Sequence, residues 1–227
     1  MIIKSRLSLL NLFLELSERE VAEKLLEEVK KEVLSCRKCE LWKGKKSYVF
    51  GEGNPCADLM FIGEAPGHNE DLQGRPFVGA AGKLLTNLIE EVLGLKREDV
   101  YIANVLKCRP PGNRDPLPDE IKACTPYLDR QIAIIKPRII ATLGRHSTKY
   151  ILSKVGIKVS SITAVRGKIF EGQMFGINLK ILPTYHPAAA LYNPRLKESL
   201  KSDFFVIKKI LEEKYEKKGG NLLSFMR

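Results

Sequence analysis

The sequence predicts an α/β fold: a three-layer sandwich in which a central, mainly parallel sheet of four strands is flanked by helices. Four short apolar runs alternate with segments whose apolar residues recur at helical spacing. That alternation is typical of parallel strands joined by crossover helices, which cover the sheet on both faces. The four expected strands are ADLMFIG (57–63), VYIANVLK (100–107), RIIATLG (138–144) and LKILPTYHP (179–187).

Helices are expected before, between and after these strands. An amphipathic N-terminal helix is predicted to begin at Ser17, which forms a capping box with Glu20, and to lead to Cys36. Residues 160–172 are compatible with an extra strand or hairpin. We expect one domain, residues 1–218, and a flexible tail of residues 219–227. The other expected helices are GKLLTNLIEEVLGL (82–95), PDEIKACTPYLDRQIAIIK (118–136), RHSTKYILSKV (145–155) and RLKESLKSDFFVIKKILEEKYEKK (195–218).

The charge balance favours a polyanionic partner such as nucleic acid, because the formal net charge is +11. A basic surface that serves only solubility would give the same net charge. The chain has no run of eighteen apolar residues, and its first residues lack a small-residue cleavage site. We therefore expect a cytoplasmic protein, monomeric and without a membrane span. Three glutamines beside abundant Lys and Glu indicate heat adaptation.

Metal binding is the leading interpretation of the cysteines. Their number is odd, which argues against a disulfide framework in a cytoplasmic chain. A CxxC pair and two cysteines on either side of a proline-rich loop could ligate one centre, either an iron–sulfur cluster or a structural zinc. A metal-free redox pair at the CxxC motif is a third alternative. The four expected ligands are Cys36, Cys39, Cys108 and Cys124, and the fifth cysteine, Cys56, is expected to be a small buried hydrophobe.

The expected binding site lies where the strands end. In open parallel sheets, ligands bind outside the carboxyl ends of the strands, where the connecting loops diverge. The motif GEAPG (63–67) follows the first expected strand, Asn104 lies near the end of the second, and His186 follows the last. We expect these three loops to build one pocket.

Five motifs occur in order along the chain: GEAPG (63–67), ED (70–71), GRPFVGAAGKLL (74–85), NVLKCRPPGNR (104–114) and HPAAAL (186–191). Together with the four cysteines, they resemble the family 4 uracil-DNA glycosylases. The resemblance implies a 4Fe-4S cluster rather than zinc. It also implies an enzyme that flips uracil out of single- or double-stranded DNA and hydrolyses its N-glycosidic bond, leaving an abasic site that initiates base excision repair.

Base recognition is expected to rest on Asn104. Its amide would accept from uracil N3–H and donate to O4, and cytosine presents the opposite pattern. Phe77 would stack on the flipped base, a contact of about 1 to 3 kcal/mol. Thymine adds one methyl group, which a soft pocket rejects by only about 1 to 3 kcal/mol, so a rigid side chain must fill that space. By family analogy this side chain is Glu70.

His186 is expected to be catalytic because it would donate to uracil O2, where negative charge grows as the base leaves. Better-known branches of the superfamily carry Asp or Asn at the third position of the first motif, where it handles the attacking water. This chain has Ala65 there, which is expected to line the substrate pocket but cannot orient water. Glu64 is therefore the expected second catalytic residue. Tyr192 and Arg195 are expected to contact the DNA backbone.

Two other function classes share some of these features. A non-catalytic iron–sulfur DNA-binding module would have the same charge and cysteines. A nucleotide hydrolase could use GEAPG as a phosphate loop, but the sequence lacks a Walker lysine pattern. The tail carries Leu222, Phe225 and Met226 at the spacing of sliding-clamp ligands, which predicts a sliding clamp as a partner, although the usual glutamine is missing.

Overall fold

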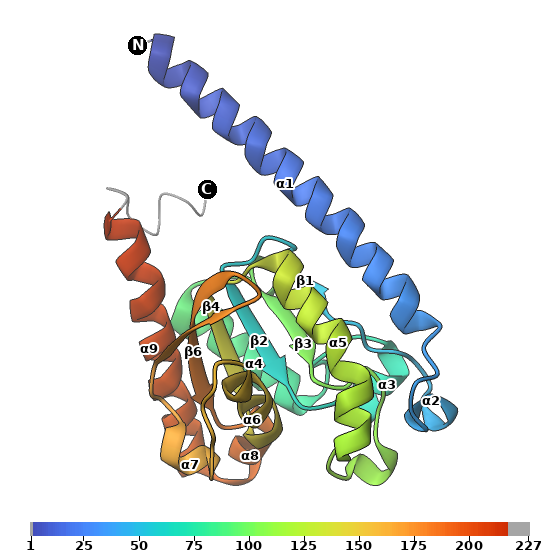
Figure 1. Ribbon diagram of the computed structural model, residues 1–227. Coiled ribbons are helices and arrows are strands. Elements are labelled where there is room, and N and C mark those ends of the chain that lie inside the picture. The colour runs from blue at the N-terminus through green and yellow to red at the C-terminus, as the bar shows by residue number, and fades with distance from the viewer. Residues whose placement is uncertain (1, 218–227) are drawn as a thin grey trace.

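The computed structural model describes the backbone of residues 2–217 and the side chains of residues 17–213. A six-stranded sheet lies at its centre, in the order β1-β3-β2-β4-β6-β5 (Figure 1). The four middle strands are parallel, and the two edge strands are antiparallel to their neighbours. The strands are β1 (Glu52–Gly53), β2 (Leu59–Gly63), β3 (Tyr101–Asn104), β4 (Ile139–Leu143), β5 (Phe170–Met174) and β6 (Ile177–Thr184).

The four strands expected from the sequence are confirmed as the parallel part of the sheet, but the expected count of four is wrong. Strand β1 is two residues long, too short to show a period of its own. Strand β5 forms a hairpin with β6, so an extra strand does precede the last one, but only residues 170–172 of the expected segment 160–172 belong to it, and Ile162–Val165 form the short helix α7. Its exposure alternates along the strand, as is usual at a sheet edge with one solvated face.

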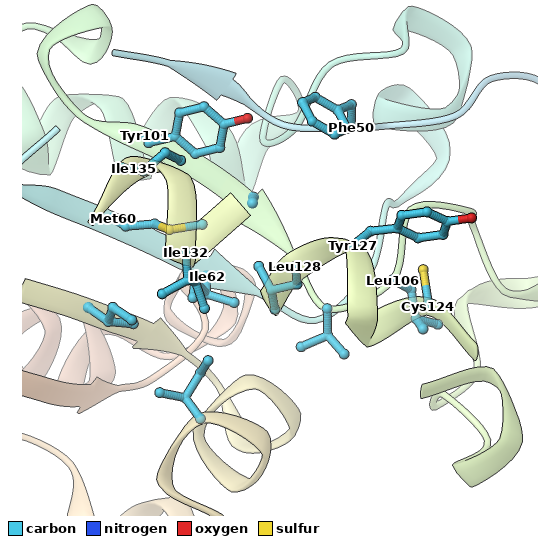
Figure 2. Close-up of a cluster of buried hydrophobic side chains, with 14 of the residues drawn as sticks. Phe50, Met60, Ile62, Tyr101, Leu106, Cys124, Tyr127, Leu128, Ile132 and Ile135 are labelled. Carbon is cyan, nitrogen blue, oxygen red and sulfur yellow. The ribbon is translucent and has the colours of Figure 1, made fainter. Parts of the chain in front are cut away.

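Helices cover both faces of the sheet. Met60 and Ile62 of β2 face a core shared with α1, α5 and α6, whereas Leu59 and Phe61 face a core shared with α4 and α9. Figure 2 shows part of the first core, with Leu128, Ile132 and Ile135 of α5 among its members. The helices are α1 (Ile2–Leu34), α2 (Leu41–Gly44), α3 (His68–Gln73), α4 (Ala80–Leu88), α5 (Pro118–Ile135), α6 (Arg145–Lys154), α7 (Ile162–Val165), α8 (Pro187–Tyr192) and α9 (Pro194–Lys217), with short helical turns η1 (Ile89–Leu93), η2 (Arg97–Asp99) and η3 (Pro111–Asn113).

Helix α1 begins earlier than predicted. It starts at Ile2, so Ser17 and Glu20 lie inside it and the predicted capping box does not mark its start. The leucine-rich residues before Ser17 have high helix propensity, which extends the helix past a local capping signal. Val29 and Val33 are fully buried in the core that α1 shares with α5, and Figure 1 shows the N-terminal half of the helix extending beyond the sheet.

The strand order creates a crevice beside β2. The chain passes from β2 to β3 on one side and then returns to β4 on the other. Loops therefore diverge at the carboxyl end of β2, which is the place where open α/β sheets bind ligands. Within the described residues, no helix has the length and apolar character needed to cross a bilayer. The predicted sliding-clamp segment lies outside the described residues.

Candidate active site

A cavity with an empty volume of about 870 Å³ opens at the carboxyl ends of the parallel strands; we refer to it as the strand-end cavity. Its wall comes from the loops that follow β2, β3 and β6 and from the start of α4. The three loops that the sequence analysis placed together do meet there. The lining residues are Glu64, Ala65, Pro66, Gly67, Glu70, Phe77, Ala81, Asn104, Pro110, Asn113, Arg114, His186 and Ala188.

Asn104 is the last residue of β3 and pairs in register with Gly63 of β2. Its side chain is almost completely buried, yet its Oδ1 atom is among the few buried polar atoms without a hydrogen-bond partner in the described part of the chain. A Cβ atom on Gly63 would lie 2.3 Å from this oxygen and 2.7 Å from the Phe77 ring. Glycine at position 63 therefore allows the amide and the ring to meet at the cavity wall.

Phe77 is held in a backbone conformation that few side chains adopt, with φ of 50°. Arg97 Nη2 donates to the carbonyl of Pro76 at 2.6 Å. Gly82 lets α4 approach, because a Cβ there would lie 1.8 Å from the Phe77 carbonyl oxygen. The Phe77 ring lies 5.5 Å from the His186 ring, centroid to centroid, at an interplanar angle of 29°. The ring thus forms a fixed flat wall.

Glu70 supports this wall from α3. Its Oε1 atom accepts hydrogen bonds from the backbone amides of Val78 and Gly79, both at 2.9 Å. The carboxylate is therefore bonded to protein, unlike a solvated loop acid. It also lines the cavity, and its predicted role beside C5 of the base stays a prediction.

His186 lies between β6 and α8 as a neutral hydrogen-bond donor. Its Nδ1 atom accepts from the Ala188 amide at 3.2 Å, so the ring proton is assigned to Nε2. Removal from water lowers the pKa of His186 to about 4, against a smaller opposite effect of Glu70. A neutral imidazole can donate from Nε2 at physiological pH without carrying charge into the cavity.

Glu64 contacts a histidine that the sequence analysis did not select. His146 Nε2 lies 3.8 Å from Glu64 Oε2 and 3.4 Å from Asp115 Oδ1. Burial raises the pKa of Glu64, and the nearby His146 opposes this shift. Ala65 presents only a methyl group to the cavity, as expected. Glu64 thus lines the strand-end cavity with a carboxylate, and the imidazole of His146 beside it can exchange a proton with that carboxylate.

Several lining residues were not predicted. Asn113 and Arg114 come from the proline-rich loop, and Arg114 forms a two-bond ion pair with Glu120 at 2.6 and 3.0 Å. Their presence in the motif NVLKCRPPGNR was the available signal. His146 does not line the cavity but contacts Glu64, and its place shortly after β4 was a signal, because the strands beside β4 were already expected to carry site residues.

The predicted DNA-contacting residues lie outside the cavity wall. Tyr192 ends α8 and is 90% exposed. Arg195 lies at the start of α9, where its backbone amide donates to Asn193 Oδ1 at 3.0 Å. Both follow the His186 loop directly, and their role stays a prediction.

A second cavity, with an empty volume of about 340 Å³, brings the four predicted metal ligands together; we refer to it as the cysteine cavity. Cys108 and Cys124 are buried, and Cys36 and Cys39 are partly buried. Figure 2 shows Cys124 with Tyr127 and Leu106 at one end of the hydrophobic core. The lining residues are Val33, Cys36, Lys38, Cys39, Leu41, Trp42, Tyr48, Lys107, Cys108, Ala123, Cys124 and Tyr127.

The cysteine cavity favours protonated thiols in the metal-free protein. Burial raises the pKa of Cys39 and Cys108, and raises that of Cys124 to about 11. Metal binding would have to displace these protons. Cys56 does not line the cavity and is exposed, so its predicted burial is wrong. It follows Pro55 in a surface turn, where its amide bonds to Asn54.

The spacing of the thiols bears on the type of centre. Among the described residues, one group of three His, Cys or acidic residues has its ligand atoms within 4.8 Å of one another. It consists of Glu64, Asp115 and His146. No three of the cysteine sulfurs come that close. A tetrahedral zinc with Zn–S bonds of about 2.3 Å would hold its sulfurs about 3.8 Å apart.

Comparison with known proteins adds a family match. Residues 50–207, which include every residue of the strand-end cavity wall, match the uracil DNA glycosylase superfamily. The chain is 62% identical to the type-4 uracil-DNA glycosylase of Sulfurisphaera tokodaii, over 82% of this chain and 84% of the relative. It is 59% identical to that of Saccharolobus solfataricus, over 81% and 85%, and 51% identical to that of Archaeoglobus fulgidus, over 79% and 89%.

Proposed function

This chain belongs to the uracil-DNA glycosylase superfamily, and we propose that it hydrolyses the N-glycosidic bond of uracil in DNA, leaving an abasic site that initiates base excision repair. The carrying observation is the buried, unpaired Oδ1 atom of Asn104 in a cavity that Phe77 and His186 also line. Buried polar groups are nearly always hydrogen-bonded, so an unpaired one in a cavity wall indicates a ligand that supplies the partner.

Uracil supplies that partner. The base must leave the helical stack before an enzyme can reach its glycosidic bond. In the cavity, N3–H of uracil donates to Asn104 Oδ1 and O4 accepts from the same amide. Cytosine has an acceptor at N3 and a donor at N4, so both contacts become repulsive. The Phe77 ring supplies the flat surface on which the base stacks.

His186 assists departure of the base. As the bond to the sugar breaks, negative charge accumulates on uracil O2. A neutral Nε2–H donor aimed at that oxygen stabilises the charge more in the transition state than in the ground state, which is what accelerates a chemical step. The Ala188 amide fixes the tautomer that this role requires.

Glu64 is proposed to position and deprotonate the attacking water. The strand-end cavity wall contains two acids, and in Glu70 the Oε1 atom already accepts from two backbone amides, which leaves Glu64 as the acid available to a water molecule. The carboxylate also stabilises the positive charge that develops on the sugar. Its contact with His146 gives the abstracted proton a neighbouring site.

We propose that Cys36, Cys39, Cys108 and Cys124 hold a 4Fe-4S cluster. The sulfurs lie farther apart than a single tetrahedral zinc requires, and cluster thiolates bind different iron atoms. When bound, the cluster supplies structural order rather than electron transfer, because hydrolysis needs no redox step. The four thiols come from the α1–α2 loop, the β3–α5 loop and α5, so metal binding would couple these segments.

An excision assay tests this function. Purified protein is incubated with oligonucleotides containing uracil, in single strands, opposite guanine and opposite adenine, and the product is cleaved with alkali. We expect strand breaks at uracil and none at cytosine or thymine. His186→Ala should slow the break while retaining DNA affinity. DNA binding without excision on any substrate would instead support the non-catalytic iron–sulfur DNA-binding module.

A further inference from the structure

We propose that Lys107 is a positioning residue for base recognition: its ammonium fixes the main chain of Asn104, while its own main chain forms part of the cysteine cavity. The proposal rests on the proposed function, because it assigns Asn104 to uracil. It makes the geometry of the base-reading amide dependent on a buried polar network that reaches the cysteines.

The side chain of Lys107 is bonded entirely inside the protein. Lys107 is 1% exposed, and within the described chain no carboxylate contributes to its electrostatic environment. Its Nζ atom donates to the backbone carbonyl of Asn104 at 2.9 Å and to Gln131 Oε1 at 2.7 Å. A buried ammonium without a carboxylate is costly, so these neutral acceptors must be well placed to retain it.

Gln131 is anchored in turn and is fully buried on α5. Its Nε2 atom donates to the carbonyl of Phe50 at 3.0 Å and to the hydroxyl of Tyr101 at 3.1 Å. Tyr101 is the first residue of β3, and Asn104 is the last. The network therefore ties both ends of this strand to α5.

The hydrogen bond from Lys107 to Asn104 acts at the end of β3, where the strand continues into the β3–α5 loop. Beyond Asn104, the amides of Val105 and Leu106 donate to the carbonyls of Gly63 and Glu64, each at 3.0 Å. These bonds hold the following residues against β2, and the Lys107 ammonium holds the Asn104 carbonyl itself. Base discrimination needs an amide placed to within about 0.5 Å, so the constraint on its main chain bears directly on recognition.

The other end of Lys107 reaches the cysteine cavity. Its backbone amide donates to Cys124 Sγ at 3.2 Å, and the residue is followed by Cys108. Its backbone carbonyl accepts from the Val49 amide at 2.8 Å. A change in the cysteine site therefore shifts the main chain that carries the ammonium, and through it Asn104.

The test uses Lys107→Met, which keeps an unbranched side chain but removes the donor. We expect the dissociation constant of free uracil to rise and the single-turnover excision rate to fall, each about 10- to 100-fold. Affinity for uracil-free DNA and iron content should stay unchanged. Gln131→Met, which does not touch the cysteine cavity, should weaken uracil binding in the same direction but less. Gln131→Glu, which keeps the acceptor for Lys107, should retain more uracil affinity than Gln131→Met.

Lys154→Met is the matched control, because Lys154 forms a surface ion pair with Asp129 at 2.6 Å, and it should leave uracil binding unchanged. Wild-type uracil binding in both Lys107→Met and Gln131→Met would overturn the proposal. Equal losses of uracil affinity, DNA affinity and iron would also overturn it, since they would indicate a general structural role. Absence of uracil binding and excision in the wild-type protein would instead overturn the proposed function, and the inference with it.

Discussion

The two cavities of this protein are built on opposite principles, although Lys107 connects them. The cysteine cavity is lined mostly by thiols, aromatic rings and aliphatic side chains, and burial raises the pKa of Cys39, Cys108 and Cys124. The strand-end cavity combines apolar residues with polar side chains, and one polar atom in its wall, Asn104 Oδ1, lacks a hydrogen-bond partner. The first arrangement suits a group that stays bound as part of the folded protein. The second suits a ligand that enters, is recognised and leaves.

The comparison separates two kinds of variant. Changes to the cysteine ligands should act first on stability and metal content, and on catalysis as a consequence. Changes in the strand-end cavity should act on catalysis and leave the fold largely intact. The four predictions below test this separation in order of expected effect.

The largest effect is expected for Cys108→Ser. Loss of a buried thiolate ligand should remove the bound iron and lower the free energy of unfolding by about 4 kcal/mol or more, with a proportionate loss of activity. Iron analysis and thermal unfolding would measure both. Cys56→Ser is the matched control, since Cys56 is exposed and outside the cavity, and it should keep full iron content. Full iron in Cys108→Ser would mean that this cysteine is no ligand.

Glu64→Gln should lower the single-turnover excision rate by about 100- to 10,000-fold with little change in unfolding temperature. In the wild-type protein, the rate should rise with pH as the Glu64 carboxyl loses its proton. Burial raises the pKa of this group, so the rise should extend above the usual range for a glutamate. The variant should lack this pH dependence. A pH–rate profile measured on both proteins decides the point, and identical profiles would remove Glu64 from the mechanism.

Asn104→Asp should lower uracil excision by about 10- to 1000-fold, because an acceptor replaces the amide donor that faces O4. Slight excision of cytosine should appear, since its N4 amino group can donate to the new acceptor. Single-turnover kinetics on uracil, cytosine and thymine oligonucleotides would measure the change. Wild-type rates on uracil would show that Asn104 only ends a strand.

The smallest effect is a pH dependence of stability. His186 has a pKa of about 4 in the folded state and about 6.5 when unfolded. Between these values the unfolded chain binds more protons, so the free energy of unfolding falls as pH falls. By linkage, His186 should contribute a loss of about 2 kcal/mol between pH 8 and pH 5. Urea unfolding of His186→Gln should show a correspondingly smaller loss over this range, and equal losses in both proteins would contradict the assigned burial.

Sequence patterns predicted the parts of the structure that depend on local periodicity and chain order. The four parallel strands are each long enough to show an apolar run, and residues that directly follow them, such as Asn104 and His186, were expected to meet. The two antiparallel edge strands were harder, because β1 has only two residues and depends on pairing with β3. Edge pairing is a property of the assembled sheet rather than of the segment.

Residues that reach the site from another loop or through the core could not be predicted in the same way. Lys107 ends an apolar run and gives no sign of a buried ammonium until α5 supplies Gln131. The place of His146 shortly after β4 was a signal in the sequence, but its contact with Glu64 depends on the pairing of β4 with β2. The capping box at Ser17 is a short-range signal that the longer helix overrode. These outcomes depend on tertiary contacts, which cannot be predicted from the sequence of one segment alone.

The unpaired oxygen of Asn104 also sets a trade-off for protein engineering. A buried acceptor without a donor destabilises the folded state by about 1 to 3 kcal/mol, and a neighbouring side chain that donated to it would recover that energy. Such a variant would be more stable but would bind the base more weakly, because the new donor would occupy the Asn104 oxygen that uracil N3–H needs. Screens that select only for heat resistance should therefore enrich variants in which a protein side chain occupies the binding pocket. Selection for turnover keeps the oxygen free.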